Sequence, residues 1–474
     1  MTLGQAADWI AAAGIPARRV GDGALPLARI HTDTRSLRAG DGFVALRGER
    51  FDANGFLADA RARGAVAAVA HGGLEAAGLA GVEVPDSRAA LLALAAGWRA
   101  QFGLPLIAVT GSNGKTTVTQ MLAAILRAQH GEAAFATRGN LNNDVGVPLT
   151  LLRLRARHAA GVVELGMNHP GEIEVLARCA RPTVALVNNA QREHQEFMHT
   201  VEAVARENGA VFASLPADGA AVFPADDAFA PLWRGLAGAR RCLTFSAAPD
   251  AAAQAGADVR LLSADWRGDR WAVRAALPDG GAIDFPLAVA GRHNLHNALA
   301  ATAAALAAGT APAAIAAGLG GFEPVAGRSR AAALDVGGRR ITLVDDSYNA
   351  NPDSVDAAIA VLAGLPPPRL LVLGDMAEVG AQGPEFHAEA GRAARARGIE
   401  RVHTLGPQAA GIARAFGAGA RHFEGIDGLC DATLEALPEV GSVLVKGSRS
   451  MRMERIVQAV EAAAGLAPAG SGGH

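Results

Sequence analysis

Residues 104–126 read LPLIAVTGSNGKTTVTQMLAAIL, and this stretch decides the fold class. The run 104–110 is short and apolar, which predicts a buried strand, and a glycine-containing turn follows it. Beyond the turn, apolar residues recur at the spacing of one helix face; they are Val118, Met121, Leu122, Ile125 and Leu126. A strand, a tight turn and a helix in this order predict an α/β fold with a mostly parallel sheet.

The turn has the composition of a phosphate-binding loop. It comprises Thr110, Gly111, Ser112, Asn113, Gly114, Lys115, Thr116 and Thr117. Glycines let the backbone N–H groups face phosphate oxygens, and the helix N-terminus adds its positive end. Lys115 would supply charge for the β- and γ-phosphates of ATP, and the Thr116 hydroxyl would reach Mg²⁺. Val109 stands where a glycine is usual, but a plain glycine-rich turn does not account for the lysine.

Two further strands are predicted at 161–165 and 183–189, with a helix between them. Glu164 lies at the end of the first strand, and His194 follows the second. The carboxyl ends of parallel strands meet at the edge of the sheet where ligands bind. A carboxylate and an imidazole at this edge could hold the metal that bridges ATP phosphates. An ordinary strand-end ion pair for Glu164 and a solvated loop position for His194 remain the alternatives.

The alternation of strands and helices predicts three α/β domains. The predicted domains are an N-terminal domain at 1–86, a central ATP-binding domain at 87–323 and a C-terminal Rossmann-like domain at 324–474. Within the central domain, residues 258–277 predict an antiparallel excursion of the sheet. The tail from about residue 466 is short low-complexity sequence and is predicted to be disordered.

Composition limits the functional classes. The chain has 474 residues, 19% of them charged, and a net charge of −2, so a nucleic-acid footprint is not expected. We expect a cytoplasmic protein, because the N-terminus does not resemble a signal peptide and no apolar run could span a bilayer. Three scattered cysteines lack metal-ligand spacing. Among 44 basic residues, only Lys115 and Lys446 are lysines, which suggests sites where a compact ammonium is needed.

At the phosphate loop the sequence resembles the Mur ligase family, whose loop typically reads TGTNGKT(T). Two other segments imply where a UDP-linked substrate binds. TRGNLNNDVGVPLTLL (137–152) resembles the family segment that contacts the sugar–peptide substrate, and HTDTRSLRAGDGFVALRGERFDANGF (31–56) resembles its uridine-recognition stretch. The matching residues are Thr137, Asn140 and Asn143 in the first segment, and Asp33, Thr34 and Arg35 in the second.

The resemblance also implies an ATP site built from two domains. GRHNLHNALAA (291–301) is similar to the family segment that faces adenine through Asn294 and Asn297. Arg328 matches the arginine that reaches ATP from the start of the last domain. Arg328 and Asp346 would complete the site when the domains close, with Arg328 at the end of a hinge segment.

Three C-terminal segments are similar to those of the family members that add D-alanyl-D-alanine. They are DDSYNANPDS (345–354), LGDMAEVG (373–380) and VLVKGSRSMRME (443–454), whereas the DNPR-type segment of members that add one amino acid is missing from the sequence. On this resemblance, the residues expected on the acceptor or acyl-phosphate side are Tyr348, Asn349, Asn351, Lys446 and Ser448.

The resemblance implies an ATP- and Mg²⁺-dependent ligase that acts through an acyl phosphate. The implied substrates are UDP-N-acetylmuramoyl-tripeptide and D-alanyl-D-alanine, the products a pentapeptide, ADP and phosphate, and the protein a monomer. Lys115, Glu164 and His194 are the expected catalytic residues, with Thr116, Glu164 and His194 holding the metal. The alternatives are another muramyl ligase, a folylpolyglutamate synthetase, a regulatory ATPase, or a scaffold without catalysis.

One segment departs from the family pattern. ARENGAVF (205–212) corresponds to the A-K-A-K-G-E-I segment, whose second lysine is commonly carbamoylated and helps to bind a second Mg²⁺. Asn208 occupies that position here. Either Glu207 or Glu196 is expected to take over the charge, or the second metal is held more weakly.

Overall fold

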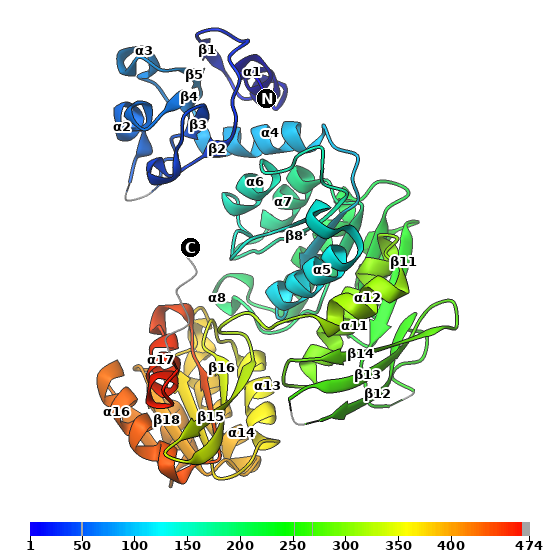
Figure 1. Ribbon diagram of the computed structural model, residues 1–474, viewed down its shortest axis with the longest axis vertical. Helices are drawn as coiled ribbons and strands as arrows, with labels where there is room; N and C mark the ends of the chain where they lie inside the picture. Colours follow the sequence, from blue (N-terminus) through cyan, green and yellow to red (C-terminus); the bar gives the residue numbers. More distant parts are fainter. Residues whose placement is uncertain (49–50, 251, 268, 467–474) are drawn as a thin grey trace.

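The protein is described by a computed structural model that covers residues 1–48, 51–250, 252–267 and 269–466. The predicted disordered tail lies, from residue 467 on, outside the described residues. Within those residues the strands form three sheets, of five, nine and six strands. Figure 1 shows the three sheets following one another along the molecule in chain order. The prediction of an α/β fold with three sheet-based units is confirmed, and the boundaries at 86/87 and 323/324, which fall between the sheets, stay predictions.

The first sheet is mostly parallel. Its strands, in spatial order, are β1 (Arg18–Val20), β5 (Ala80–Glu83), β4 (Ala65–Ala70), β3 (Asp41–Val44) and β2 (Ile30–His31). Only the β1–β5 pair among them is antiparallel. The accompanying helices are α1 (Leu3–Ala12), α2 (Leu57–Ala62) and α3 (Leu74–Ala77), with a short 3₁₀ helix η1 at Thr34–Ser36. The Thr2 side chain and Gln5 cap the start of α1 reciprocally, which fixes its entry.

Helix α4 (Ser87–Arg99) joins the first unit to the second. It begins at Asp86, whose carboxylate accepts the backbone N–H groups of Arg88 and Ala89 at 2.8 and 3.0 Å. It packs against α1 on one side, and against α6 (Gly146–Leu151) and α7 (Glu172–Ala180) on the other. Gly97 permits the close approach of α1, because a Cβ at this position would overlap the ring of Trp9.

The nine-stranded sheet carries the predicted phosphate loop. Its strands, in spatial order, are β14 (Ala282–Leu287), β13 (Trp271–Ala276), β12 (Val259–Trp266), β11 (Arg241–Ser246), β10 (Ala220–Pro224), β9 (Val184–Val187), β6 (Leu106–Thr110), β8 (Ala160–Glu164) and β7 (Ala134–Ala136). The strands from β7 to β12 are parallel, and β12, β13 and β14 are antiparallel. The predicted antiparallel excursion at 258–277 is therefore confirmed.

Successive residues of the central strands face different cores, as the pleat of a strand requires. Leu106 and Ala108 of β6 belong to the core beneath α4, α6, α7 and α9 (Val201–Gly209). Ile107 and Val109 belong to the core beneath α5 (Lys115–His130), α11 (His293–Ala307) and α12 (Pro312–Gly320). Helices therefore cover both faces of the sheet, and the loop ends of β6, β8 and β9 stay open at one edge.

The third sheet has the same organisation. Its strands, in spatial order, are β15 (Arg330–Val336), β16 (Arg339–Asp346), β20 (Ser442–Lys446), β17 (Arg369–Gly374), β18 (Arg401–Leu405) and β19 (Ala420–Phe423). Only β15 is antiparallel among these strands. One face packs on α13 (Pro352–Ala363), α14 (Gly383–Ala396) and α15 (Ala410–Phe416), and the other on α16 (Ile426–Ala436) and α17 (Glu454–Ala463). In the part of the chain that the structure describes, we find no helix with the length and apolarity needed to cross a membrane.

Candidate active site

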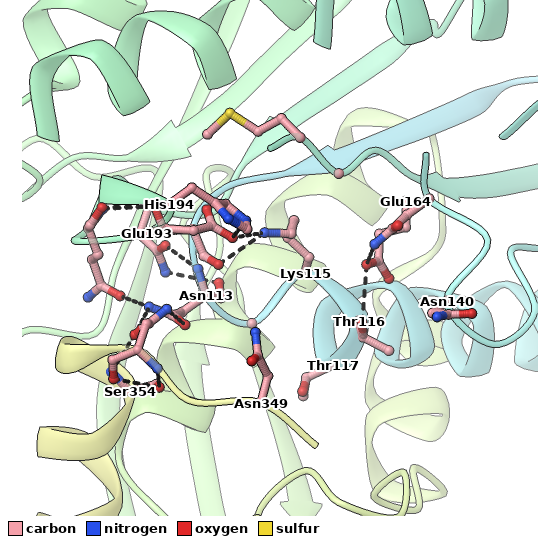
Figure 2. Close-up of a pocket in the computed structure, with 18 of the residues that line it drawn as sticks. Asn113, Lys115, Thr116, Thr117, Asn140, Glu164, Glu193, His194, Asn349 and Ser354 are labelled. Atoms are coloured by element: carbon pink, nitrogen blue, oxygen red, sulfur yellow. Dashed lines mark hydrogen bonds and ion pairs between the residues drawn. The ribbon is translucent and has the colours of Figure 1, made fainter. Parts of the chain in front are cut away.

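A cavity of about 1200 Å³ opens between the second and third sheets. The phosphate loop, the ends of β8 and β9, helix α11 and the start of the C-terminal unit contribute its walls. Figure 2 shows the loop residues between Glu164 on one side and Glu193 with His194 on the other. The cavity therefore lies at the carboxyl edge of the parallel strands, where ligands bind in α/β proteins.

Backbone geometry explains both glycines of the loop. Gly111 and Gly114 have φ values of 127° and 82°, which disfavour other residues. A Cβ at Gly111 would lie 2.9 Å from the backbone nitrogen of Asn188, and one at Gly114 would overlap Asn297 Oδ1. Helix α5 begins directly after Gly114, so its N-terminal N–H groups face the cavity.

Lys115 is folded back over its own loop. Its Nζ donates to the carbonyl oxygens of Gly111 and Ser112 at 2.6 and 3.0 Å, and to Glu193 Oε1 at 2.7 Å. An ammonium has three N–H donors, so these contacts occupy all of them. The Glu193 side chain is buried, and its Oε2 has no hydrogen-bond partner among the described residues.

Glu164 lies on the other side of the loop. Its Oε1 accepts from the Thr116 hydroxyl at 3.1 Å and from Asn142 Nδ2 at 2.7 Å. Its backbone N–H donates to the Thr137 hydroxyl at 3.0 Å, which fixes the end of β8. Oε2 of Glu164 is also buried, and the described part of the chain offers it no hydrogen-bond partner. Thr116 and Glu164, both predicted metal ligands, are thus brought together.

His194 does not join that pair. Its Nδ1 lies 2.6 Å from Glu378 Oε2, and its Nε2 lies 3.5 Å from Glu193 Oε1. Burial opposes a charge on the ring, but the carboxylates of Glu193 and Glu378 raise the pKa of His194 to about 9. A protonated imidazole has no lone pair for a metal. The predicted ligand set of Thr116, Glu164 and His194 is therefore not assembled in this arrangement.

Amide side chains that the sequence analysis did not identify hold the loop. Asn189 Oδ1 accepts from Asn113 N at 2.9 Å, and Asn188 Nδ2 donates to Asn113 O at 2.7 Å. Asn188 Nδ2 also donates to Asn297 Oδ1 at 2.9 Å, and Asn297 Nδ2 donates to Asn294 Oδ1 at 2.8 Å. Both predicted adenine residues, Asn294 and Asn297, line the cavity, with their amides already bonded within the protein. Asn188 and Asn189 directly follow the parallel strand β9, and this position in the sequence could have identified them as residues of the site.

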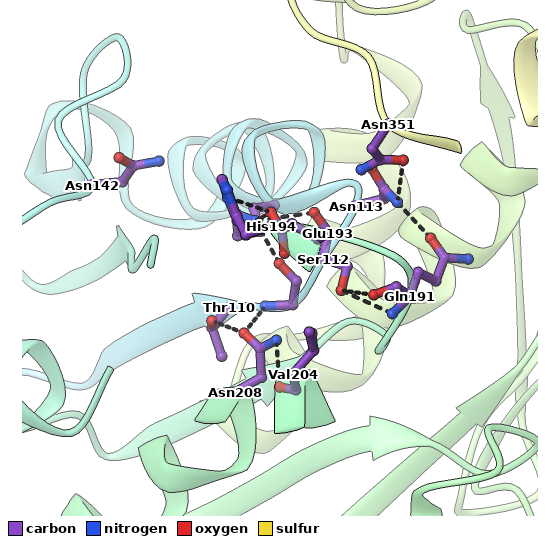
Figure 3. A network of polar contacts seen from close by, with 12 residues as sticks. Thr110, Ser112, Asn113, Asn142, Gln191, Glu193, His194, Val204, Asn208 and Asn351 are labelled. Atoms are coloured by element: carbon purple, nitrogen blue, oxygen red, sulfur yellow. Dashed lines mark hydrogen bonds and ion pairs between the residues drawn. The ribbon is translucent and has the colours of Figure 1, made fainter. Parts of the chain in front are cut away.

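Position 208 faces away from the cavity. Asn208 is fully buried, and its Oδ1 accepts from Thr110 Oγ1 at 2.5 Å and from Gly111 N at 2.9 Å, as Figure 3 shows. Its Nδ2 donates to Val204 O at 3.0 Å. Asn208 therefore braces the start of the phosphate loop.

The two carboxylates expected to replace the missing lysine lie elsewhere. Glu207 accepts the backbone N–H groups of Gly171 and Ile173, both at 2.8 Å, at the start of α7. Glu196 is exposed. The residues lining the cavity include neither of them. The structure does not support the expectation that Glu207 or Glu196 supplies this charge, because the Glu207 carboxylate is bonded at the start of α7 and neither residue lines the cavity. Glu193 lies next to Lys115 instead.

The C-terminal unit closes the cavity with most of its predicted residues. Lys446 Nζ donates to Asp346 Oδ2 at 2.6 Å and to Asn349 O at 2.8 Å. The Arg328 guanidinium lies 4.2 Å from the centre of the Tyr348 ring. Asn351 Nδ2 donates to Asn113 Oδ1 at 2.9 Å, which links the third unit directly to the phosphate loop.

Several predicted substrate residues do not line the cavity. Ser448 is buried and accepts from Ala377 N at 2.7 Å. Asp33 and Arg35 pair with each other at 2.6 Å in the first unit, with Thr34 between them in η1. Asn140 and Asn143 do line the cavity, while Thr137 lies buried behind Glu164. The uridine-recognition and acceptor roles of these residues stay predictions.

A lysine-bearing glycine loop between a parallel strand and a helix defines a phosphate-binding α/β protein. The Mur ligase middle domain matches residues 109–305, and the Mur ligase glutamate ligase domain matches residues 330–449. The chain belongs to the Mur ligase family.

Several individual proteins are similar to this chain over nearly its full length. The UDP-N-acetylmuramoyl-tripeptide--D-alanyl-D-alanine ligase of Escherichia coli (strain K12) is 41% identical over 92% of this chain and 94% of its own. The ligase of the same name from Bacillus subtilis (strain 168) is 33% identical over 90% and 92%. A crystal structure of MurF from Acinetobacter baumannii superposes with a TM-score of 0.86 at 31% identity, covering 96% and 97%. MurF from Thermotoga maritima in complex with ADP gives 0.79 at 25% identity, covering 92% and 98%.

Proposed function

We propose that this protein is an ATP-dependent ligase that joins D-alanyl-D-alanine to UDP-N-acetylmuramoyl-tripeptide, a step of peptidoglycan precursor synthesis. The main support is the 41% identity, over nearly the whole chain, to the Escherichia coli ligase of that name. The cavity supports the same proposal, because it brings the phosphate loop together with Arg328, Asn349 and Lys446 of the C-terminal unit. We expect the reaction to take place in the cytoplasm.

The chemistry has two steps. A carboxylate oxygen of the tripeptide attacks the γ-phosphorus of ATP, the bond from that phosphorus to ADP breaks, and an acyl phosphate forms. The amino group of D-alanyl-D-alanine then attacks the acyl carbon, phosphate leaves, and the nitrogen loses a proton as the amide forms. The protein must hold the reactants in line and neutralise charge on the transferring group.

Residues on both sides of the cavity suit these tasks. Lys115 and the N-terminus of α5 lie at the cavity wall where we expect the phosphates to bind. On the opposite wall, Arg328 and Lys446 add positive charge, and Asn349 adds an amide. The Asn113–Asn351 contact brings the two walls together at the loop, which supports a site completed only when the C-terminal unit is docked.

The residues present also fit a magnesium ion accompanying ATP. Glu164 Oε2 is buried and unpaired within the described chain, and the Thr116 hydroxyl lies beside Glu164. Among the described residues, no group of three or more His, Cys, Asp or Glu side chains could hold a metal by itself. Mg²⁺ usually binds one or two carboxylates and takes its other ligands from phosphates and water, so this sparse set suits it. When bound, the ion would neutralise charge on the phosphates.

The proposal can be tested by measuring phosphate release from ATP in the presence of Mg²⁺ and UDP-N-acetylmuramoyl-tripeptide. We expect release to require D-alanyl-D-alanine and a UDP-linked pentapeptide to be found by mass spectrometry. Lys115→Met should lower the turnover number about 100- to 1000-fold, the range for loss of one charge-stabilising group. Turnover with free D-alanine, diaminopimelate or glutamate instead would assign a different ligase, and turnover without an acceptor would assign an ATPase.

A further inference from the structure

Asn208 is a fully buried amide near the end of α9, and its hydrogen bonds reach the start of the phosphate loop (Figure 3). Its Oδ1 accepts from Thr110 Oγ1 at 2.5 Å and from Gly111 N at 2.9 Å. An amide oxygen has two lone pairs, so the loop uses both of them. Nδ2 donates to Val204 O at 3.0 Å, within α9 itself. The amide is therefore fixed on its own helix and holds two donors of the loop.

Gly111 needs this acceptor because the neighbouring strand ends before it. Val109 of β6 pairs with Glu164, the last residue of β8, and Leu165 N donates to Val109 O at 2.8 Å. In a continued parallel ladder, Gly111 N would donate to a carbonyl oxygen of that strand. Asn208 Oδ1 takes the place of this carbonyl, so the loop leaves the sheet without an unpaired buried donor.

The carbonyl oxygen of Gly111 holds the lysine of the loop. It accepts from Lys115 Nζ at 2.6 Å, while the nitrogen of Gly111 is bonded to Asn208. A buried donor without an acceptor is costly, so loss of the Asn208 amide would favour another orientation of Gly111. The position of the Lys115 ammonium thus depends on a side chain that does not line the cavity.

The same contacts make position 208 unsuited to a carbamate. In the family segment that ARENGAVF (205–212) resembles, a lysine at this position is commonly carbamoylated and helps to bind a second Mg²⁺. A metal ligand needs an oxygen with a free lone pair, and Asn208 Oδ1 has none. The chain's two lysines are paired elsewhere, Lys115 with Glu193 and Lys446 with Asp346. The carbamate, and a metal supported by it, therefore do not fit this site.

We propose that Asn208 is a positioning residue of the ligase, which fixes Gly111 and through it Lys115, so that the protein turns over without a carbamate. The statement about turnover rests on the proposed function, whereas the effect on Lys115 rests on nucleotide binding alone. Where related ligases carry a charged group, this chain carries an amide with two hydrogen bonds to the phosphate loop.

Binding of a methylene-bridged ATP analogue with Mg²⁺ tests the positioning role without any ligase substrate. We expect Asn208→Ala to bind the analogue about 10- to 30-fold more weakly, because the Gly111 donor loses its acceptor. In a Lys115→Met background, the same change should weaken binding less than about 2-fold, since residues that act through one another are not additive. Unchanged affinity in Asn208→Ala would overturn the proposal, and so would equal losses in both backgrounds.

Thr433→Val is the matched control for loss of a buried hydrogen bond. Thr433 is fully buried in α16, and its hydroxyl donates to Leu429 O at 2.8 Å. This change should lower thermal stability, as Asn208→Ala does, but leave analogue affinity unaltered. A similar loss of affinity in Thr433→Val would attribute the effect to general destabilisation and reject the proposal.

A second variant covers the case in which Asn208→Ala does not fold. Asn208→Asp keeps an oxygen for both loop donors and loses only the bond to Val204 O, so analogue affinity should stay within about 3-fold. A loss as large as that caused by Lys115→Met would contradict the positioning role.

Bicarbonate dependence tests the remaining part of the proposal on the unaltered protein. Phosphate release with the tripeptide and D-alanyl-D-alanine is measured in buffer freed of carbon dioxide, and again after bicarbonate is added. We expect the same turnover number in both, whereas a family member with a lysine at this position should gain activity. A rise with bicarbonate would mean that Lys115 or Lys446 is carbamoylated, and would overturn the proposal. If no pentapeptide forms, the proposed function fails, and analogue binding still decides the role of Asn208.

Discussion

The second unit of the molecule is joined to its two neighbours in opposite ways. At the apolar seam, defined as α4 with α1, α6 and α7, one hydrophobic cluster runs from Leu3 of the first unit to Ala237 of the second. At the polar seam, which joins the second unit to the third, the contacts are between polar side chains. Arg192 pairs with Asp353 and Glu389. His194 contacts Glu378, and Asn113 contacts Asn351. No hydrophobic cluster of buried residues spans this second junction in the described chain.

The difference between the apolar and the polar seam indicates which of the two junctions is suited to movement. Apolar burial contributes roughly 25 cal/mol per Å² and is lost when surfaces separate, so the apolar seam favours a fixed arrangement. Partly exposed ion pairs contribute about 1 kcal/mol or less each, and water can replace them. We therefore expect the polar seam to open more readily than the apolar seam.

The largest effect on stability is expected from Leu94→Ala at the apolar seam. Leu94 of α4 is fully buried in the shared cluster, and truncation of a buried leucine costs about 2–5 kcal/mol. Calorimetry should show the first two units melting earlier as one transition. Leu362→Ala, equally buried in α13, should lower only a transition of the third unit. If Leu94→Ala splits the first two units into separate transitions, the shared core is not cooperative.

A smaller loss is expected from Gly97→Ala. Alanine favours a helix by about 1 kcal/mol over glycine, but here its Cβ would overlap the Trp9 ring, and overpacking costs about 1–3 kcal/mol. We expect net destabilisation by about 1 kcal/mol in denaturant unfolding. Gly235→Ala in α10 (Ala230–Ala237) is the control, because nothing lies within 4 Å of its Cβ position, and it should stabilise. Stabilisation by both changes would mean that Trp9 moves aside without cost.

Arg192→Ala should change shape more than stability. The Arg192 side chain donates to Asp353 and Glu389 across the polar seam, and we expect a loss of about 1 kcal/mol or less. Small-angle scattering at low ionic strength should show a larger radius of gyration, and 0.5 M salt should have a similar effect on the unaltered protein. Arg397→Ala breaks an equivalent pair with Asp356 inside the third unit and should leave the radius unchanged. An unchanged radius in Arg192→Ala would show that other contacts hold the seam.

The smallest expected effect is on the reactivity of a buried thiol at the apolar seam, and it involves no change in stability at neutral pH. Burial raises the pKa of Cys179 to about 12, and its Sγ lies 3.5 Å from Leu92 O of α4. At pH 8 a disulfide reagent should label Cys179 about 1000-fold more slowly than an ordinary thiol, with about a tenfold rise per pH unit. The folded protein keeps a proton that the unfolded chain loses above pH 9, so unfolding becomes easier as pH rises further. Rapid labelling at pH 8 would mean that the seam opens.

Local pattern predicted much of this fold. The strand, turn and helix of 104–126 correspond to β6, the loop and α5, because period and glycine placement are properties of the segment itself. The antiparallel strands at 258–277 could be predicted for the same reason, because their pattern also lies within one segment. Thr116 and Glu164 were correctly expected together, since parallel strands share one carboxyl edge.

Side-chain pairing across long separations could not be predicted in this way. Glu193 is 78 residues from Lys115, and its contact depends on the register of β6 and β9. His194 follows the right strand, but Glu378 of the third unit draws it away from Glu164. Asn208 matched a family position in sequence, yet its side chain accepts from the Thr110 hydroxyl and the Gly111 backbone N–H, pairings 98 and 97 residues apart that the segment itself does not reveal.

The chain's two lysines have a practical consequence for chemical labelling. Both lie in the cavity, and their side chains are 13% and 4% exposed for Lys115 and Lys446. Apart from the α-amino group, they are the only primary amines in the sequence. An amine-reactive acylating reagent would thus have its internal targets confined to one cavity. Mass-spectrometric footprinting of just two peptides would then measure which ligands cover the loop and which cover the opposite wall.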